Sequence, residues 1–159
     1  MIFVSNSGPI ISFARAYRLE ILRRVLKEII VPEAVYEEIV MNGENKPGAE
    51  EIGNEEWVKK ERIKDRYEVE QLPSNLGIGE REAIVLSREL RATLLIDDRS
   101  ARKEAEKRGI VCFGSLRVLK EAKEKGFIRA VNPIGDELRK AGLRIKNSLY
   151  QKFLQEIGE

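Results

Sequence analysis

Residues 78–113 read IGEREAIVLSRELRATLLIDDRSARKEAEKRGIVCF, and the order of patterns in this stretch decides the fold class. Residues 78–90 place apolar side chains at helical spacing, and 93–96 form a short apolar run typical of a buried strand. A charged helical segment then separates that run from a second one at 110–113. Strands that alternate with helices form parallel βαβ units. The stretch therefore predicts two neighbouring strands of a doubly wound α/β protein.

The rest of the chain extends the same pattern. We expect further strands at 2–5, 29–31 and 57–60, and helices at about 9–15, 18–27 and 33–41. The segment 42–48 (NGENKPG) predicts a loop, with a short helix from Pro47 to about Gly53. Residues 61–74 are charged and unpatterned, so we expect a mobile loop there, and the pattern is helical from Ser115 to the end. The prediction is one α/β domain over 1–159, three-layer α/β/α around a central parallel sheet, with 132–159 as a helical C-terminal extension packed on it.

Composition excludes several kinds of site. The chain has no histidine, so His-based acid–base chemistry and His metal ligands are excluded, and hard oxygen ligands remain. A net charge of +2 means that nucleic-acid binding must come from local basic patches. Cys112 lies in the apolar run GIVCF, where we expect a buried side chain, and one cysteine allows no internal disulfide.

The sequence also bears on location and source. No apolar stretch approaches the roughly 18 residues of a membrane helix, and the first residues lack the basic region of a signal peptide. We therefore expect a cytoplasmic protein with no membrane partner. The charged share of 35% suits ion-pair networks at high temperature, which is compatible with a thermophilic source.

Polar residues end two of the predicted strands. Asn6 follows the first strand, and Asp97 and Asp98 follow the fourth. In an open parallel sheet, ligands bind beyond the carboxyl ends of the strands. We therefore expect Asn6 and this pair of aspartates at one edge of the sheet, in a position to face a ligand.

Helical wheels at 100° per residue select two glutamates near that edge. On 33–41, Glu38 lies on the flank of the buried face, whereas Glu33 and Glu37 point to solvent. On 78–90, Glu80 falls inside the apolar arc, and Glu82 and Glu89 fall outside it. Carboxylates beside apolar surface are unfavourable unless they are paired or bind a metal, and a hard divalent cation would relieve their mutual repulsion.

Each of these residues has a plainer interpretation. Glu80 follows the start of a helix, where the helix dipole alone favours an acid. Asp98 serves equally well as a helix N-cap, Glu38 as the partner of a lysine, and Asn6 as a turn former. These alternatives stay open at this point.

Four motifs resemble those of PIN-domain proteins in order and spacing. They are VSNSGPIISFAR (4–15), VPEAVYEEIV (31–40), LGIGEREAIVLSREL (76–90) and LLIDDRSARKEA (94–105). The later segments GSLRVLKEAKEKGFI (114–128) and GLRIKNSLYQKFLQEIGE (142–159) are most similar to the branch named DUF3368. The resemblance covers essentially the whole chain.

The resemblance implies a nuclease that binds Mg²⁺ or Mn²⁺ through an acidic cluster and cleaves RNA. Glu38, Glu80 and Asp98 match the acidic positions, with Asp97 as an adjacent candidate. Basic residues near the pocket, namely Arg15, Arg99 and Arg102, are candidates for holding the RNA backbone, although a solvated surface charge is the plainer explanation for each of them. The resemblance further implies a homodimer.

The chain departs from the family pattern at two positions. Asn6 stands where the family has aspartate, and Ile96 stands where a serine or threonine is frequent. The lost charge favours an alternative function as a catalytically weak or inactive PIN-like module that binds RNA or a partner. A toxin that pairs with an antitoxin-like protein is a related hypothesis. A phosphate-accepting receiver domain would carry its acid pair after the first strand, and here the pair follows the fourth.

Overall fold

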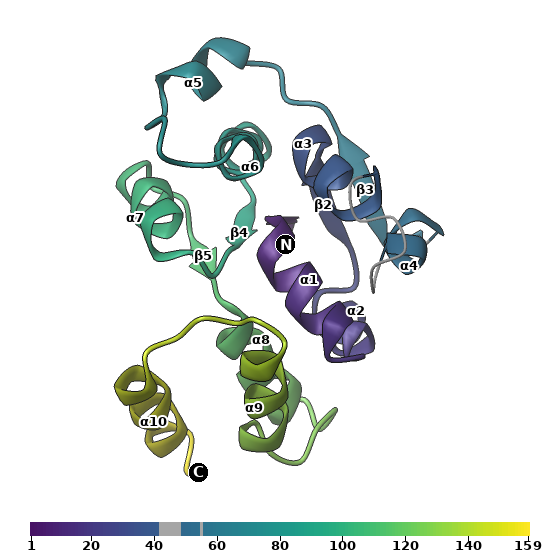
Figure 1. The fold of residues 1–159 in the computed structure, drawn as a ribbon, viewed down its shortest axis with the longest axis vertical. Helices are drawn as coiled ribbons and strands as arrows, with labels where there is room; N and C mark the ends of the chain where they lie inside the picture. The colour runs from purple at the N-terminus through teal and green to yellow at the C-terminus, as the bar shows by residue number, and fades with distance from the viewer. Residues whose placement is uncertain (42–48, 55) are drawn as a thin grey trace.

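The computed structural model describes residues 1–41, 49–54 and 56–159, and within them one parallel sheet forms the centre of the molecule (Figure 1). Its strand order is β3-β2-β1-β4-β5, and all four pairings are parallel. The strands are β1 (Phe3–Ser5), β2 (Ile29–Pro32), β3 (Val58–Glu61), β4 (Thr93–Leu95) and β5 (Cys112–Phe113). The expected α/β fold with a central parallel sheet is confirmed.

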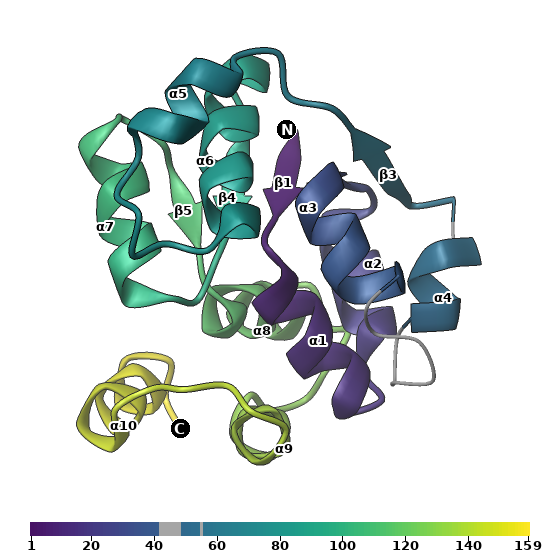
Figure 2. The same cartoon turned by 45° about the horizontal axis from the view of Figure 1, so that its top comes forward.

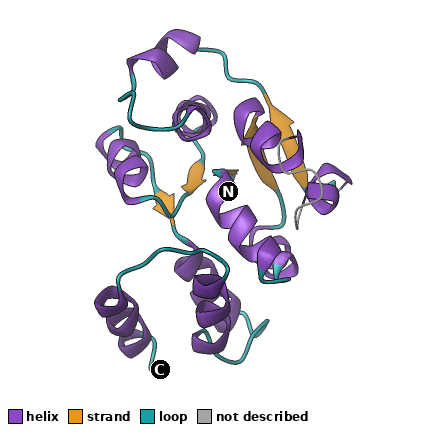
Figure 3. Cartoon of the chain, viewed as in Figure 1, coloured by secondary structure: helices purple, strands orange, loops and turns teal. Residues whose placement is uncertain are grey.

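Helices connect and cover these strands (Figure 3). They are α1 (Ser7–Arg15), α2 (Leu19–Leu26), α3 (Glu33–Tyr36), α4 (Ala49–Asn54), α5 (Arg66–Gln71), α6 (Ile78–Leu90), α7 (Arg99–Lys107), α8 (Ser115–Glu124), α9 (Asn132–Lys140) and α10 (Asn147–Glu156). The segment predicted as one helix over 33–41 is α3 continued by a π-helical turn, η1 (Glu37–Met41). Such turns are rare, and they are frequent at functional sites. The predicted helix start at Pro47 lies outside the described residues.

The prediction of an unpatterned loop over 61–74 is wrong. The segment contains the end of β3 and the helix α5, whose first turn is capped by Asp65 through a hydrogen bond from the Glu68 amide (3.0 Å). Val69 and Leu72 are buried in the apolar cluster that α6 forms with one face of the sheet. Widely spaced apolar residues were enough to fold this charged segment, because each of them reaches the core.

Two apolar clusters lie between the sheet and the helices that cover its two faces. Helices α1, α2 and α8, whose arrangement Figure 2 shows, contribute to one cluster, together with Phe3 and Leu95. Helices α5, α6 and α7 contribute to the other, together with Val4 and Leu94. Successive strand residues therefore point to opposite faces, as the pleat requires.

The last two helices pack on the first of these clusters. Tyr150 of α10 is 1% exposed, and its hydroxyl contacts Asp136 of α9 (2.9 Å). Arg18 forms a two-pronged ion pair with Glu137 (2.9 and 3.1 Å), which joins α9 to the residue before α2. The C-terminal helices thus have both apolar and ionic contacts with the rest of the chain.

The strand order reverses between β1 and β4. From β1 the chain adds β2 and β3 on one side, and it then returns to add β4 and β5 on the other. Ser5 is in register with Leu95, so the residues that follow β1 and β4 leave the sheet side by side. A crevice beyond the strand ends at such a reversal is the usual ligand site of an open α/β sheet.

In the described residues no helix is long and apolar enough to cross a membrane.

Candidate functional site

Asn6 is the first polar residue beyond β1, at the N-cap of α1. It is 7% exposed, its backbone amide donates a hydrogen bond to the Leu95 carbonyl (3.0 Å), and its side chain does not cap the helix. Its Oδ1 atom is buried and has no hydrogen-bond partner among the described residues. A buried amide oxygen without a partner is unfavourable, so a turn-forming role alone does not account for this side chain.

Glu38 enters from the π-helical turn. Although the residue is exposed, its Oε2 atom accepts a hydrogen bond (2.8 Å) from the hydroxyl group of Ser7, which is the residue that follows Asn6. Its Oε1 atom lies against Gly79 of α6, where even one added methyl group would overlap the carboxylate. No lysine pairs with Glu38 within the described residues, so the alternative of a lysine partner is not observed.

Glu80 lies in the first turn of α6. Its Oε1 atom accepts a hydrogen bond from the Gly77 amide (2.9 Å), so the helix-start explanation holds for this oxygen. Burial raises the pKa of the Glu80 carboxyl group, and the neighbouring Asp98 and Glu38 carboxylates raise it further. Glu80 is therefore in electrostatic contact with both of the other acids, which a helix-start role does not require.

Asp98 caps α7 and also faces Glu80. Its Oδ2 atom accepts a hydrogen bond from the Ala101 amide (2.9 Å), as expected for an N-cap. The Asp98 carboxylate raises the pKa of Glu80, so the two carboxyl groups lie close together. Asp98 therefore caps α7 and also neighbours Glu80.

Asp97, the adjacent candidate for a metal ligand, is bound by the start of α8 instead of by the other acids. Both of its oxygens accept hydrogen bonds from Ser115 at the start of α8, one from the amide (2.8 Å) and one from the hydroxyl (2.5 Å). Burial raises the pKa of Asp97, although these hydrogen bonds and the charge of Arg102 act to lower it. The pleat explains the separation: Leu95 faces the α8 side and Ile96 the α6 side, so Asp97 and Asp98 continue to opposite faces.

Glu38, Glu80 and Asp98 therefore meet near Asn6 at the β1–β4 edge. In the described part of the chain, however, no three acidic or cysteine side chains have the spacing to hold a metal ion as they stand. Like charges repel when no cation lies between them. Each carboxylate has one oxygen fixed by a hydrogen bond from its own neighbourhood, which leaves the second oxygen for a ligand.

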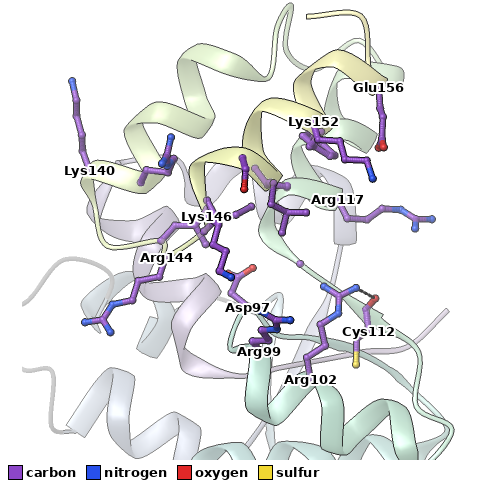
Figure 4. Close-up of a pocket in the computed structure, with 18 residues that line it drawn as sticks. Asp97, Arg99, Arg102, Cys112, Arg117, Lys140, Arg144, Lys146, Lys152 and Glu156 are labelled. Carbon is purple, nitrogen blue, oxygen red and sulfur yellow. Dashed lines mark hydrogen bonds between the residues drawn. The ribbon is translucent and has the colours of Figure 1, made fainter.

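The basic candidates divide in two. Arg99 and Arg102 line a cleft on the Asp97 side of the edge (Figure 4). Arg15 lies at the opposite end of α1 from Asn6, beside Gly142, and it does not line that cleft. Cys112, expected to be buried, is half-buried in the same cleft, and desolvation raises its pKa to about 11.

The wheel for residues 78–90 misplaced Glu82. Its side chain is 6% exposed and accepts hydrogen bonds from the Ala34 amide (3.1 Å) and from Arg66 (2.9 Å). Helix α6 is covered by α3, α5 and α7 as well as by the sheet, so a single buried arc does not describe it. Ser7 and Gly79, which position Glu38, were also not selected from the sequence, and their places beside Asn6 and Glu80 are the signal that would have found them.

Comparisons with known proteins identify the family and the fold of this chain. A family model described as DUF3368, PIN domain, matches residues 2–159. Among solved structures, the chain is similar to a PilT N-terminus domain protein from the hyperthermophilic archaeon Sulfolobus solfataricus P2. The TM-score is 0.53 at 16% sequence identity, over 92% of this chain and 98% of the other, so the likeness concerns the fold. The search of curated proteins gave no match.

Proposed function

Because the chain belongs to the DUF3368 PIN-domain family, we propose that it is a metal-dependent ribonuclease that hydrolyses phosphodiester bonds at the β1–β4 edge. The observation that carries the proposal is the meeting of three carboxylates beside the unpartnered, buried Oδ1 of Asn6. Such a group is unfavourable by itself and becomes favourable around a cation.

The side chains fit Mg²⁺ or Mn²⁺. Both ions prefer oxygen ligands, and carboxylate and amide oxygens are what this edge offers. Glu38, Glu80 and Asp98 would hold the ion, with Asn6 facing it directly or through water. When bound, the ion would lower the pKa of a water molecule and neutralise charge that builds on the phosphate.

The chain's own residues prepare this site before any ligand arrives. Ser7 holds Glu38, the Gly77 amide holds Glu80, and the Ala101 amide holds Asp98. Each carboxylate has one oxygen held in this way, so only its second oxygen has to move toward a cation and a phosphate, which favours catalysis. Gly79 supports the same arrangement by leaving room for Glu38.

A second candidate function follows from Asn6. A unit charge about 4 Å from a cation contributes roughly 4 kcal/mol at an effective dielectric near 20, before desolvation offsets part of it. The amide forgoes that contribution, so a catalytically weak or inactive module that binds RNA or a partner is the alternative. A homodimer and an antitoxin-like partner stay predictions from the family resemblance.

A titration of Mn²⁺ with a labelled RNA substrate tests the proposal. The wild type is compared with Asp98→Asn, which keeps a good helix cap while removing the charge, and with Glu37→Gln, a change at an exposed neighbour of Glu38. We expect cleavage that depends on Mn²⁺ in the wild type and in Glu37→Gln, and its loss in Asp98→Asn. RNA binding without Mn²⁺-dependent cleavage in the wild type would instead establish the binding module.

A further inference from the structure

A cleft of about 1480 Å³ lies between the α7–α8 side of the sheet edge and the C-terminal helices α9 and α10 (Figure 4). Eight arginines and lysines line it, against two acids, Asp97 and Glu156. Asp97 is already committed to Ser115 through both oxygens. The cleft therefore concentrates positive charge in a chain whose net charge is only +2.

Most of these cations have no carboxylate partner in the part of the chain that the structure describes. Within residues 1–41, 49–54 and 56–159, no ion pair engages six of the eight: Arg99, Arg139, Lys140, Arg144, Lys146 and Lys152. Outside the cleft, arginines and lysines are paired with nearby acids at many positions, as Arg108 is with Glu104 (3.0 Å). Unpaired like charges around a hollow repel one another, and a polyanion that enters the hollow relieves that repulsion.

Three of the eight cations are oriented by contacts with neighbouring groups. Arg102 donates to the Cys112 carbonyl (3.4 Å), Arg117 lies over the ring of Phe113 (4.4 Å) and Arg139 over that of Tyr150 (4.6 Å). Guanidinium groups that are already oriented lose little freedom when they bind phosphate, for which their planar fork is suited.

The lining of the cleft is partly apolar. It includes Leu116, Leu149 and Phe153, and Leu149 is 56% exposed. Cations together with aromatic and aliphatic side chains match the two halves of a single-stranded nucleic acid, namely a charged backbone and flat bases.

The cleft also adjoins the acidic site. Asp97 lines the cleft, Asp98 belongs to the acidic cluster, and Arg99 lines the cleft again. In Figure 4, Arg99, Arg102 and Lys146 surround Asp97, and Arg117 and Lys152 lie farther along. Residues 97–99 therefore connect the cleft to the sheet edge at which the carboxylates meet.

From these contacts we infer that the cleft formed with α9 and α10 binds the sugar–phosphate backbone of single-stranded RNA and leads it to the acidic edge. The inference rests on the proposed ribonuclease function, which makes RNA the polyanion concerned. The C-terminal helices are then a part of the substrate-binding surface, in addition to their packing on the core.

Binding of a fluorescent 12-nucleotide single-stranded RNA in EDTA tests this inference by polarisation, without cleavage. The cleft variant carries Arg144→Gln, Lys146→Gln and Lys152→Gln. The matched control carries Lys27→Gln, Lys59→Gln and Lys125→Gln, which removes the same charge from exposed positions outside the cleft. Circular dichroism and melting temperature verify that both fold.

Each phosphate contact on a single strand contributes about −0.7 to the slope of log K against log salt, so three lost contacts should make the slope shallower by about 2. If the electrostatic part vanishes near 1 M salt, binding at 0.15 M should weaken about 50-fold in the cleft variant. The control should lose much less in both quantities. Equal effects of the two variants on RNA binding would overturn the inference. If the cleft variant alone lost binding to a labelled polyglutamate peptide, the cleft would instead be a protein-docking face. Because no metal is present, a failure of catalysis leaves this result intact, and the two proposals fail separately.

Discussion

Replacing Asn6 by aspartate changes the charge of the acidic site with almost no change in shape. The residue is 7% exposed and its Oδ1 atom has no described partner, so the new carboxylate enters a buried place beside three other acids. A charge about 4 Å from the ion would contribute roughly 4 kcal/mol per unit of cation charge at an effective dielectric near 20. Desolvation of the new carboxylate opposes much of this. We therefore expect the Kd for Mn²⁺ to fall by about 10- to 100-fold, which is about 1.4–2.8 kcal/mol.

Without metal the same substitution should destabilise the protein. A fourth acid adds like-charge repulsion, and a cost of about 1–2 kcal/mol would lower the melting temperature by roughly 2–8 °C for a chain of this size. Isothermal titration with Mn²⁺ measures the affinity, and thermal unfolding in EDTA measures the cost. Asn147→Asp, the same chemical change at an exposed position on α10, is the control. An unchanged Kd in a folded Asn6→Asp variant would show that residue 6 contacts neither the ion nor its water.

Three other substitutions or reactions test separate parts of the account. Glu82→Ala removes a buried acceptor of two hydrogen bonds and should lower the free energy of unfolding by about 2–3 kcal/mol. Glu33→Ala breaks only an exposed ion pair and should lower it by less than about 1 kcal/mol. Equal losses in denaturant titrations would contradict the burial of Glu82. Gly79→Ala should displace the Glu38 carboxylate and weaken Mn²⁺ binding with little loss of melting temperature, since alanine favours a helix by about 1 kcal/mol, and unchanged Mn²⁺ affinity would argue against Glu38 as a ligand. The pKa of Cys112 is raised to about 11, so little thiolate is present at pH 8 in the native state. Cys112 should therefore react with iodoacetamide about 100-fold more slowly in the native state than in urea. Similar rates in both states would refute this.

Most of the sheet was predictable because β1, β2, β4 and β5 are short, largely apolar runs between turn or helix signals, whereas β3 (VKKE) has one buried apolar residue, Val58. The covered faces of α6 were not predictable in the same way. A helical wheel assumes one buried arc, but residues 82–87 are all buried, because helices pack on this helix from several directions. Glu82 was therefore placed in solvent although it lies inside the protein.

The candidate site was predictable in its residues and less so in its geometry. Strand alternation would have separated Asp97 from Asp98, since neighbours along an extended segment point to opposite faces. The π-helical turn that carries Glu38 has no signature in the apolar pattern, because it depends on how one helix meets another. The basic cleft was equally hidden: its cations come from segments that only the packing of α9 and α10 brings beside α7.

The location of bound Mn²⁺ tests the central claim most directly. Crystals soaked in MnCl₂ and measured at a wavelength with strong manganese anomalous scattering would give the position of the ion independently of any activity. The account predicts one principal peak at the β1–β4 edge, with Glu38, Glu80 and Asp98 as ligands and Asn6 facing the ion. A peak beside Asp97 and Ser115, or no peak at the edge with Mn²⁺ bound elsewhere, would contradict it.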